Sequence, residues 1–440
     1  MKNVDIIQES IDYIEQNLKY ELSAEALAKR AAFSVFHYYR IFQCLIGVSV
    51  MQYIQKRKLL HAIYEIGIGR PMLKVEAEYG FETHAGFYKA FKKEFGCSPT
   101  TYLNLHKPKK PYKMNLSQEK HIMITHKKLK DILGNWNIDL PITIEDIYYS
   151  NEERATNCWN INKRFIIKVG KNIEGLKQHS NISRLLVEAG LLASLPIKTK
   201  CDSDYNIEDE LYFCLMEPVE GTMMNSKEIF NDENYKGKAR YIGEIVGQLH
   251  NVIKNYDNKI VCNCPNLFDN VSEWAISIVK NSLEIPYKFY DDYKAVFGQL
   301  YSKLPKQIIH RDPNPRNMIM KDENTVGFID FELSEKNIRI YDPCYAATAI
   351  FSEIFSESKN IEKWFDIYEN IILGYDSVCN LTEEEKEALP YVVLSNQIVC
   401  YAYFSQLDKF EELKHINKEM TLLLYKNRKR LDVFGILQRV

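Results

Sequence analysis

The sequence predicts a multi-domain protein, in which an all-α N-terminal domain of two helix-turn-helix units precedes an α+β domain with two lobes. Three observations carry this prediction. The first 106 residues contain an internal repeat with helical periodicity, a segment rich in lysine and proline follows, and beyond residue 126 helical patterns alternate with short apolar runs typical of strands. A chain of 440 residues, 46% of them apolar, is long enough for about three domains with cores of their own.

The charge is unevenly distributed along the chain. Residues 1–110 contain 16 Lys+Arg and 11 Asp+Glu, whereas the remaining residues contain 41 and 48. The net charge of −2 therefore combines a basic front with an acidic rear. Such an asymmetry indicates different partners for the two parts.

Cysteine usage and hydropathy indicate the compartment. The ten cysteines are scattered without a C-x-x-C pair, so we expect free thiols rather than a disulfide framework or a zinc site. The N-terminus is amphipathic and acidic, unlike a signal peptide. The sequence contains no apolar run of the roughly 18 residues that span a membrane. We therefore expect a cytoplasmic protein with no membrane partner.

An offset of 49 residues relates two similar helical units at the front of the chain. The matched positions are Tyr38, Phe42, Gly47, Ser49 and Tyr53 with Phe87, Phe91, Gly96, Ser98 and Tyr102. In the first unit, Ser23 is placed to cap an alanine-rich helix, and Ser34 to cap a second helix that ends at Gly47. The spacing therefore predicts a helix pair joined by a short turn.

The second unit follows a long predicted helix over 52–66. Residues 73–79 form its first helix, Gly80 makes the turn, and Thr83 or Glu82 starts the next helix. The inner stripe of that helix is Phe87, Phe91 and Phe95. Taken alone, this pattern also fits a small helical bundle with solvated charges.

The segment "AEYGFETHAGFYKAFKKEFGCSPTTYL" closely resembles the second helix-turn-helix of AraC/XylS-type transcription regulators, and the resemblance covers about residues 4 to 106. It implies two recognition helices in adjacent major-groove segments of double-stranded DNA, about 34 Å apart. The implied contacts are Val35, Phe36, His37 and Arg40 in the first helix and Thr83, His84, Tyr88, Lys89 and Lys92 in the second. Because the first helix is unusually aromatic, we expect it mainly to position the second.

The segment "HKPKKPYK" has two prolines, four lysines and no apolar periodicity, so it predicts a linker. We place the DNA-binding domain at 1–106, the linker at 107–125, and the second domain at 126–440. Beyond the linker, "KKLKDILGNW" predicts a helix, and "ITIEDIYYS", "ATNCWNI" and "RFIIKVG" predict three strands.

The stretch "QIIHRDPNPRNMIMKDENTVGFIDFE" alternates strands with polar loops. Phosphoryl transfer needs a residue that orients the attacking hydroxyl and oxygen ligands for magnesium. Asp312 can take the first role, and Asn317 and Asp330 the second. Lys168, on the strand "RFIIKV", can supply a cation for the nucleotide phosphates. A lone lysine in a strand or a lone aspartate in a loop means little, so the prediction depends on the set.

This set resembles the kinase-like fold of aminoglycoside phosphotransferases and choline kinases, over roughly 126 to 440. The resemblance implies a lobe at about 126–220 and a larger lobe from about 221, with "YFCLMEPVEG" as the hinge. It also implies Mg²⁺ with ATP or GTP as cofactors. Asp312 would be the base, Lys168 would hold the α and β phosphates, and Asn317 and Asp330 would bind the metal.

The sequence departs from this family's pattern at several positions. Arg311 stands where aminoglycoside enzymes usually have glycine, and Asn314 and Arg316 replace the common His and Gly. The predicted phosphate-covering turn "SNEERATN" lacks glycine. The glutamate that would pair with Lys168 is ambiguous between Glu174 and Glu188.

The leading hypothesis is a DNA-binding transcription regulator whose kinase-like domain senses or phosphorylates a small hydroxylated or cationic molecule. One alternative is a small-molecule kinase with an accessory DNA-binding domain. Another is a catalytically silent module that binds ligand without turnover.

Overall fold

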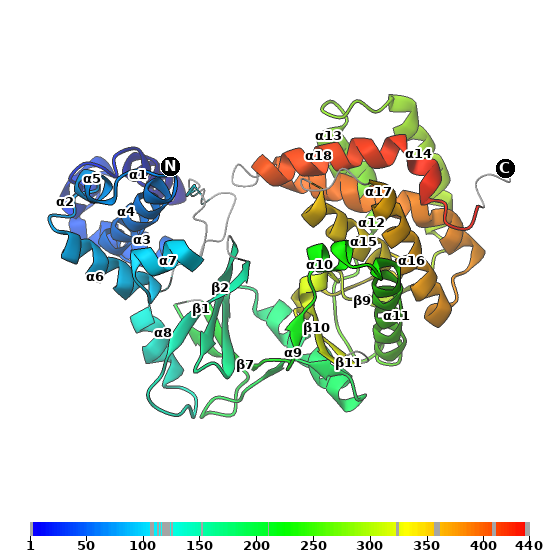
Figure 1. Cartoon of the computed structure of the whole chain (residues 1–440), viewed down its shortest axis with the longest axis horizontal. Coiled ribbons are helices and arrows are strands. Elements are labelled where there is room, and N and C mark those ends of the chain that lie inside the picture. The colour runs from blue at the N-terminus through cyan, green and yellow to red at the C-terminus, as the bar shows by residue number, and fades with distance from the viewer. Residues whose placement is uncertain are drawn as a thin grey trace. The chain divides into compact units, whose positions relative to one another are not determined.

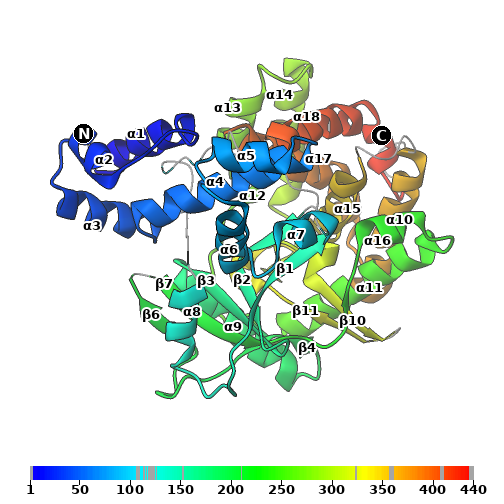
Figure 2. The same cartoon turned by 60° about the vertical axis from the view of Figure 1, so that its left-hand side comes forward.

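The computed structural model of the protein divides into two compact units, which are described separately (Figures 1 and 2). The first unit comprises residues 1–173 and 196–218, and the second comprises residues 174–195 and 219–440. The structure describes residues 3–105, 110, 111, 114, 116, 124, 126–150, 153–209, 211–322, 325–355, 361–406 and 411–435. Most of the predicted linker and the tip of the turn "SNEERATN" lie outside these residues.

The first unit begins with short helices joined by tight turns. They are α1 (Asn3–Gln16), α2 (Ala24–Arg30), α3 (Val35–Ile46), α4 (Val50–Gly67), α5 (Met72–Glu78), α6 (His84–Phe95) and α7 (Pro99–Leu105). The side chains of Ser34 and Thr83 accept hydrogen bonds from backbone N–H groups in the first turns of α3 and α6. Gly80 has a φ of +80°, a conformation that favours glycine, so the chain can turn sharply between α5 and α6. The predicted helix-turn-helix units are confirmed.

A buried ion pair joins α1 to α4 inside this helical part. The Glu15 carboxylate accepts hydrogen bonds from Arg57 Nε at 2.6 Å and Nη2 at 2.8 Å, and both side chains are 8% exposed. Burial alone would raise the pKa of Glu15, but hydrogen bonds from His61, Arg57 and Tyr53 lower it to about 2. The pair is therefore stabilising while Glu15 is ionised.

A six-stranded sheet forms the rest of the first unit. Its strands are β1 (Ile144–Ser150), β2 (Glu153–Ile161), β3 (Phe165–Gly170), β5 (Leu195–Pro196), β6 (Asn206–Glu208) and β7 (Leu211–Glu217). The order is β1-β2-β3-β7-β5, and β6 pairs with β7. Helix α8 (His126–Leu133) packs its apolar side chains on this sheet, with Trp136, Trp159 and Phe213 in the shared core (Figure 2). The predicted helix and three strands are present.

The second unit consists of small sheets and a large helical part. The sheet strands are β4 (Leu192–Ala193), β8 (Thr222–Met223), β10 (Met318–Asp322) and β11 (Thr325–Phe328) in the order β4-β11-β10-β8, and β9 (Lys306–Ile309) pairs with β12 (Glu335–Ile338). The helices include α9 (Ile173–Glu188), α10 (Ser226–Asn231), α11 (Tyr235–Lys254), α12 (Leu267–Asp269), α13 (Ile276–Val279), α14 (Tyr287–Tyr301), α15 (Tyr341–Ile354), α16 (Ile361–Cys379), α17 (Glu383–Ser405) and α18 (Glu411–Lys426).

Helices α11 and α16 lie side by side and pack so closely that their backbones are in contact (Figure 1). A Cβ atom on Gly243 would overlap the carbonyl oxygen of Ile371, and one on Gly374 would overlap that of Arg240. Only glycine therefore fits at these two positions. The crossing fixes α11 against α16 in the core of the unit.

Two expectations about the whole chain can be compared with the structure. Each of the ten cysteines is a thiol in the structure rather than half of a disulfide. Within the described residues, none of the helices combines the length and the apolar character that crossing a membrane requires.

Candidate functional site

The loop from His310 to Asn317 joins β9 to the β10–β11 hairpin, and a buried carboxylate holds its start. Asp342, fully buried at the beginning of α15, accepts hydrogen bonds from the backbone N–H groups of His310 at 2.8 Å and Arg311 at 3.0 Å. The Nε2 atom of the buried His250 lies 2.9 Å from the same carboxylate. The first residues of the loop and His250 of α11 thus both bond to Asp342 of α15. This carboxylate therefore holds the start of the loop in place.

Asp312 follows directly and is held by two amide donors. Asn314 Nδ2 donates to its carboxylate at 2.8 Å and Asn317 Nδ2 at 3.3 Å. Burial raises the pKa of Asp312 above its usual range, and the negative charge of Asp330 raises it further, against the lowering effect of Asn314, His310 and Tyr345. A held carboxylate with a raised pKa suits a general base.

Asn317 and Asp330 lie at the same end of the β10–β11 hairpin. The Asn317 carbonyl accepts from Ile329 N at 3.1 Å, and the next pair along the ladder is Met318 with Phe328. Asn317 Nδ2 donates to the Asp312 carbonyl at 2.9 Å, so its amide oxygen is the atom able to ligate a cation. Asp330 has φ +69° and acts electrostatically on Asp312. These oxygen donors fit a magnesium ion.

Helix α9 is joined to the segment that follows Asp330 by three hydrogen bonds. Gln178 Nε2 donates to the carbonyls of Phe331 at 3.1 Å and Ser334 at 2.6 Å, and Phe331 N donates to His179 Nδ1 at 3.1 Å. The Phe331 ring lies between the rings of His179 and His310, with centroids 6.0 and 4.7 Å away. The backbone that carries Asp330 is therefore attached to α9.

Sequence reasoning missed Gln178 and His179 and offered two glutamates of the same helix. Glu174 pairs with Lys177 at 2.8 Å on the exposed side of α9, and Glu188 is exposed at the end of the helix. The buried side of α9 carries His179 with Leu176, Ile182 and Leu186. The helical spacing of these buried residues was the available signal.

Lys168 lies in the first unit, on β3. Its neighbours Ile167 and Val169 are buried whereas Lys168 is half-buried, which is the predicted alternation. It pairs across the sheet with Cys158 of β2 and Cys214 of β7. The structure thus brings Asp312, Asn317 and Asp330 together in the second unit and places Lys168 on a central strand of the first.

Arg311 has a φ of +77°, a left-handed conformation that favours glycine and costs other residues roughly 1 kcal/mol or more. This explains why an arginine is unusual at that position. Besides the bond to Asp342, its Nε atom lies 3.0 Å from a Glu335 oxygen, and its guanidinium lies 4.3 Å from the centroid of the Tyr341 ring. These contacts offset the strain.

The recognition residues predicted in the helical part differ in exposure and contacts. Phe36 is 79% exposed, whereas His37 packs edge-on against Phe33. Thr83 caps α6, and His84 Nδ1 lies 2.9 Å from both carboxylate oxygens of the buried Glu76. The remaining candidates Val35, Arg40, Lys89 and Lys92 are exposed, and Tyr88 is half-buried.

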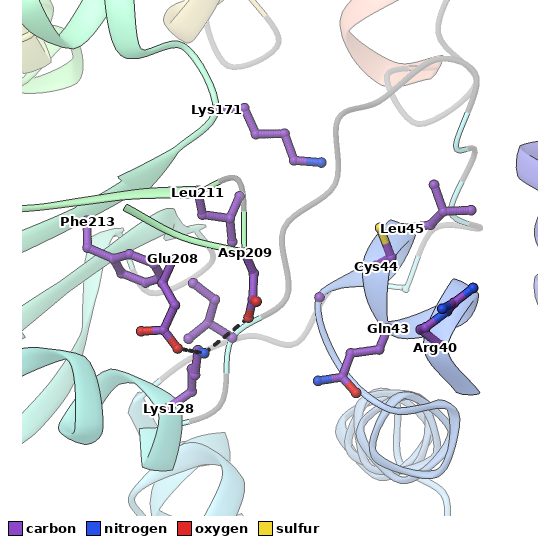
Figure 3. Close-up of a pocket in the computed structure, with 12 residues that line it drawn as sticks. Arg40, Gln43, Cys44, Leu45, Lys128, Lys171, Glu208, Asp209, Leu211 and Phe213 are labelled. Atoms are coloured by element: carbon purple, nitrogen blue, oxygen red, sulfur yellow. Dashed lines mark hydrogen bonds and ion pairs between the residues drawn. The ribbon is translucent and has the colours of Figure 1, made fainter. Parts of the chain in front are cut away.

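A pocket in the first unit is lined by α3 residues such as Arg40 and Cys44 and by Lys128, Glu208 and Asp209 (Figure 3). Lys128 forms ion pairs with both acidic residues. The lining contains none of the residues expected to hold nucleotide, metal or acceptor.

Comparison with known proteins supports both parts of this description. A family model described as "Helix-turn-helix domain" matches residues 27–104, and one described as "Phosphotransferase enzyme family" matches residues 174–362. The multiple antibiotic resistance protein MarA of Salmonella typhimurium is 33% identical over 110 residues, which are 24% of this chain and 87% of MarA. The activator AarP of Providencia stuartii is 30% identical over 98 residues, 22% of this chain and 73% of AarP.

Other relatives are matched over a smaller share of their length. The regulator YbfP of Bacillus subtilis is 33% identical over 97 residues. These residues are 22% of this chain and only 33% of that relative. A solved amicoumacin kinase, in complex with AMP-PNP, Ca²⁺ and Ami, is 14% identical with a TM-score of 0.50, over 70% of this chain and 92% of that chain. That likeness shows the kinase-like fold alone. The chain therefore belongs to the AraC-type helix-turn-helix regulators through its N-terminal part, and its C-terminal part has a kinase-like fold in which residues 174–362 match the phosphotransferase family model.

Proposed function

We propose that the protein is a sequence-specific transcription regulator whose phosphotransferase-family domain binds ATP or GTP with Mg²⁺ and phosphorylates a small hydroxylated or cationic molecule. The observation that carries the catalytic part is the held carboxylate of Asp312. It is half-buried, held by hydrogen bonds from Asn314 and Asn317, and adjacent to oxygen ligands suited to a metal. A turn former on the surface needs none of these contacts.

In the proposed reaction, the oxygen of the acceptor hydroxyl attacks the γ-phosphorus while Asp312 accepts the proton of that hydroxyl. The bond from the γ-phosphorus to the bridging oxygen breaks, and the nucleoside diphosphate leaves. Bound magnesium would supply charge neutralisation on the phosphates, and Asn317 and Asp330 would hold it. Lys168 would pair with the α and β phosphates, and Asp342 keeps the loop in position through the amides of His310 and Arg311.

The DNA-binding part of the proposal rests on α3 and α6, which present exposed residues at capped helix N-termini, and on the excess of basic residues in the front of the chain. Lysines would contact phosphates and give a salt-dependent affinity, whereas side chains in the first turns would contact base edges.

A second candidate function is ligand sensing without turnover, and α9 favours it. Kinase-like enzymes pair the strand lysine with a helix glutamate, but the glutamates of α9 are exposed at its two ends. In that case nucleotide or ligand binding would alter DNA affinity while no phosphate is transferred.

One experiment separates the two functions. Nucleotide consumption by the full chain is measured over a panel of amino-alcohols, aminosugars and sugars, together with affinity for a selected DNA duplex in the presence of the same compounds. Consumption that depends on one acceptor and is lost in Asp312→Asn supports the kinase. Absence of consumption, with a ligand-dependent shift in DNA affinity that survives Asp312→Asn, supports the sensor and rejects the catalytic assignment.

A further inference from the structure

Glu76 is a buried carboxylate inside the second helix-turn-helix unit, where an apolar residue would be expected. It lies in α5 and is 2% exposed. Burying a carboxylate is costly unless it is paired. Its partner is His84, the first residue of the recognition helix α6, whose Nδ1 atom lies 2.9 Å from each carboxylate oxygen.

The internal repeat shows that the fold itself does not require this carboxylate. Phe33 N donates to the Ala28 carbonyl at 3.0 Å, and Phe81 N donates to the Glu76 carbonyl at 3.0 Å, so Ala28 and Glu76 are equivalent positions in the two turns. The helix that follows begins at Val35 in the first unit and at His84 in the second. The first unit therefore has alanine and valine where the second has a glutamate and a histidine.

The pair gives the imidazole a defined orientation. Because a carboxylate accepts hydrogen bonds, Nδ1 carries the proton, and Nε2 lies on the other edge of the ring. The His84 side chain is 48% exposed. Its ring lies 4.5 Å from the ring of Tyr88, whose hydroxyl is 2.6 Å from Thr100 Oγ1 in α7. With Nδ1 bonded to Glu76, Nε2 is the ring nitrogen of this half-exposed side chain that remains for a bond outside the unit.

We propose that Glu76 is a positioning residue that holds His84 ready to read the edge of one base pair in the major groove. This inference rests on the proposed DNA binding. A side chain fixed before binding loses less conformational entropy in the complex than a flexible one. Lys89 and Lys92 on the same helix are long exposed side chains suited to phosphates, whereas His84 is held by a buried carboxylate before any DNA binds.

The test uses the full chain and a duplex selected from a random library with the wild-type protein. Affinity is then measured for that duplex and for all single base-pair changes in it, with wild type, Glu76→Ala, Glu76→Gln, His84→Ala and the Glu76→Ala/His84→Ala double variant. We expect one base-pair position at which the wild type discriminates by on the order of 10-fold. His84→Ala and Glu76→Ala should lose that discrimination, and the double variant should lose no more than either.

Matched variants separate positioning from folding and from general affinity. Alanine at residue 76 is what the equivalent first turn already contains, and Glu76→Gln keeps an oxygen that accepts the Nδ1–H bond, so it should retain most of the preference. Lys92→Ala should weaken all duplexes equally. Unchanged discrimination in Glu76→Ala, or an equal loss for every duplex, overturns the inference. A wild-type protein that shows no sequence preference refutes the proposed DNA recognition itself.

Discussion

The His310–Asn317 loop and the recognition helix α6 position their polar side chains in different ways. In the loop, Asp312 is half-buried and accepts hydrogen bonds from Asn314 and Asn317 of the same loop, and its partial loss of water raises its pKa above the usual range. In α6, Lys89 and Lys92 are exposed, which the proposed DNA contacts require. His84 combines the two, since its buried partner Glu76 fixes one edge of an exposed ring. The comparison indicates that a polar side chain is held in place where its proposed role depends on the position of one of its atoms.

The largest expected effect tests the buried side of this comparison. Asp312→Ala should lower turnover by on the order of 100-fold or more while leaving nucleotide affinity nearly unchanged, because a base acts on the acceptor in the transition state. Asp330→Ala should lower both, because a metal ligand contacts the nucleotide complex. Steady-state kinetics and calorimetry with ATP and GTP measure the two effects, and the exposed Asp291→Ala is the control. Equal losses of nucleotide affinity in both variants would contradict the assignment of Asp312.

The ion pair of Glu15 gives a pH-dependent prediction for stability. Its pKa is about 2 in the folded protein against an ordinary value of 4.5, so its contribution to stability is fully present above pH 4.5 and is lost as the pH falls toward 2. At neutral pH, Glu15→Gln should destabilise the first unit by roughly 3 kcal/mol, since one unit of pKa corresponds to about 1.4 kcal/mol.

Thermal unfolding of the full chain at pH 7 and at decreasing pH measures this effect. The gap between wild type and Glu15→Gln should narrow as the pH falls, whereas the exposed Glu25→Gln should match the wild type throughout. A gap that stays constant with pH would show that the stabilisation comes from packing rather than charge.

The attachment of α9 to the Phe331 backbone predicts a smaller effect. Gln178→Ala removes two hydrogen bonds that hold the segment after Asp330, so affinity for nucleotide with magnesium should fall by roughly 10-fold. Calorimetry at several magnesium concentrations measures it, and the exposed Lys177→Ala on the same helix is the control. A loss that is independent of magnesium would argue against positioning of the metal ligand.

The smallest effect concerns the exposed side of the comparison. Lys92→Ala should weaken binding to every duplex by a few-fold and reduce the slope of log affinity against log salt by about one. Lys93→Ala, on the next residue of α6, should leave that slope unchanged if Lys93 faces away from the DNA. A sequence-dependent loss in Lys92→Ala would instead indicate a base contact.

The sequence predicted features that depend on nearby residues. Ser34, Thr83, Gly47 and Gly80 act within one turn of the chain, so capping and turn rules located the helix pairs correctly. The pattern that predicted the loop around Asp312 also consists of residues close together in the sequence. The family comparisons confirm the two domain types, whereas the roles of individual site residues stay predictions.

Contacts between distant residues could not be predicted from the sequence. Gln178 lies 153 residues before Phe331, and His250 lies 92 residues before Asp342. Glu76 and His84 are only eight residues apart, but they sit on different helices, so helical periodicity does not relate them. Such pairs depend on how the elements pack, which a pattern along the chain does not specify.

The backbone contact between α11 and α16 has a consequence for how sequence variation in this protein would be interpreted. Gly243 and Gly374 admit no side chain, although neither belongs to the His310–Asn317 loop or to helices α3 and α6. In a mutational scan, both positions would appear as intolerant as Asp312. Measuring the amount of folded protein would distinguish them. Replacements at the glycines should lower that amount, whereas replacements at Asp312 should leave it unchanged and abolish the proposed phosphoryl transfer.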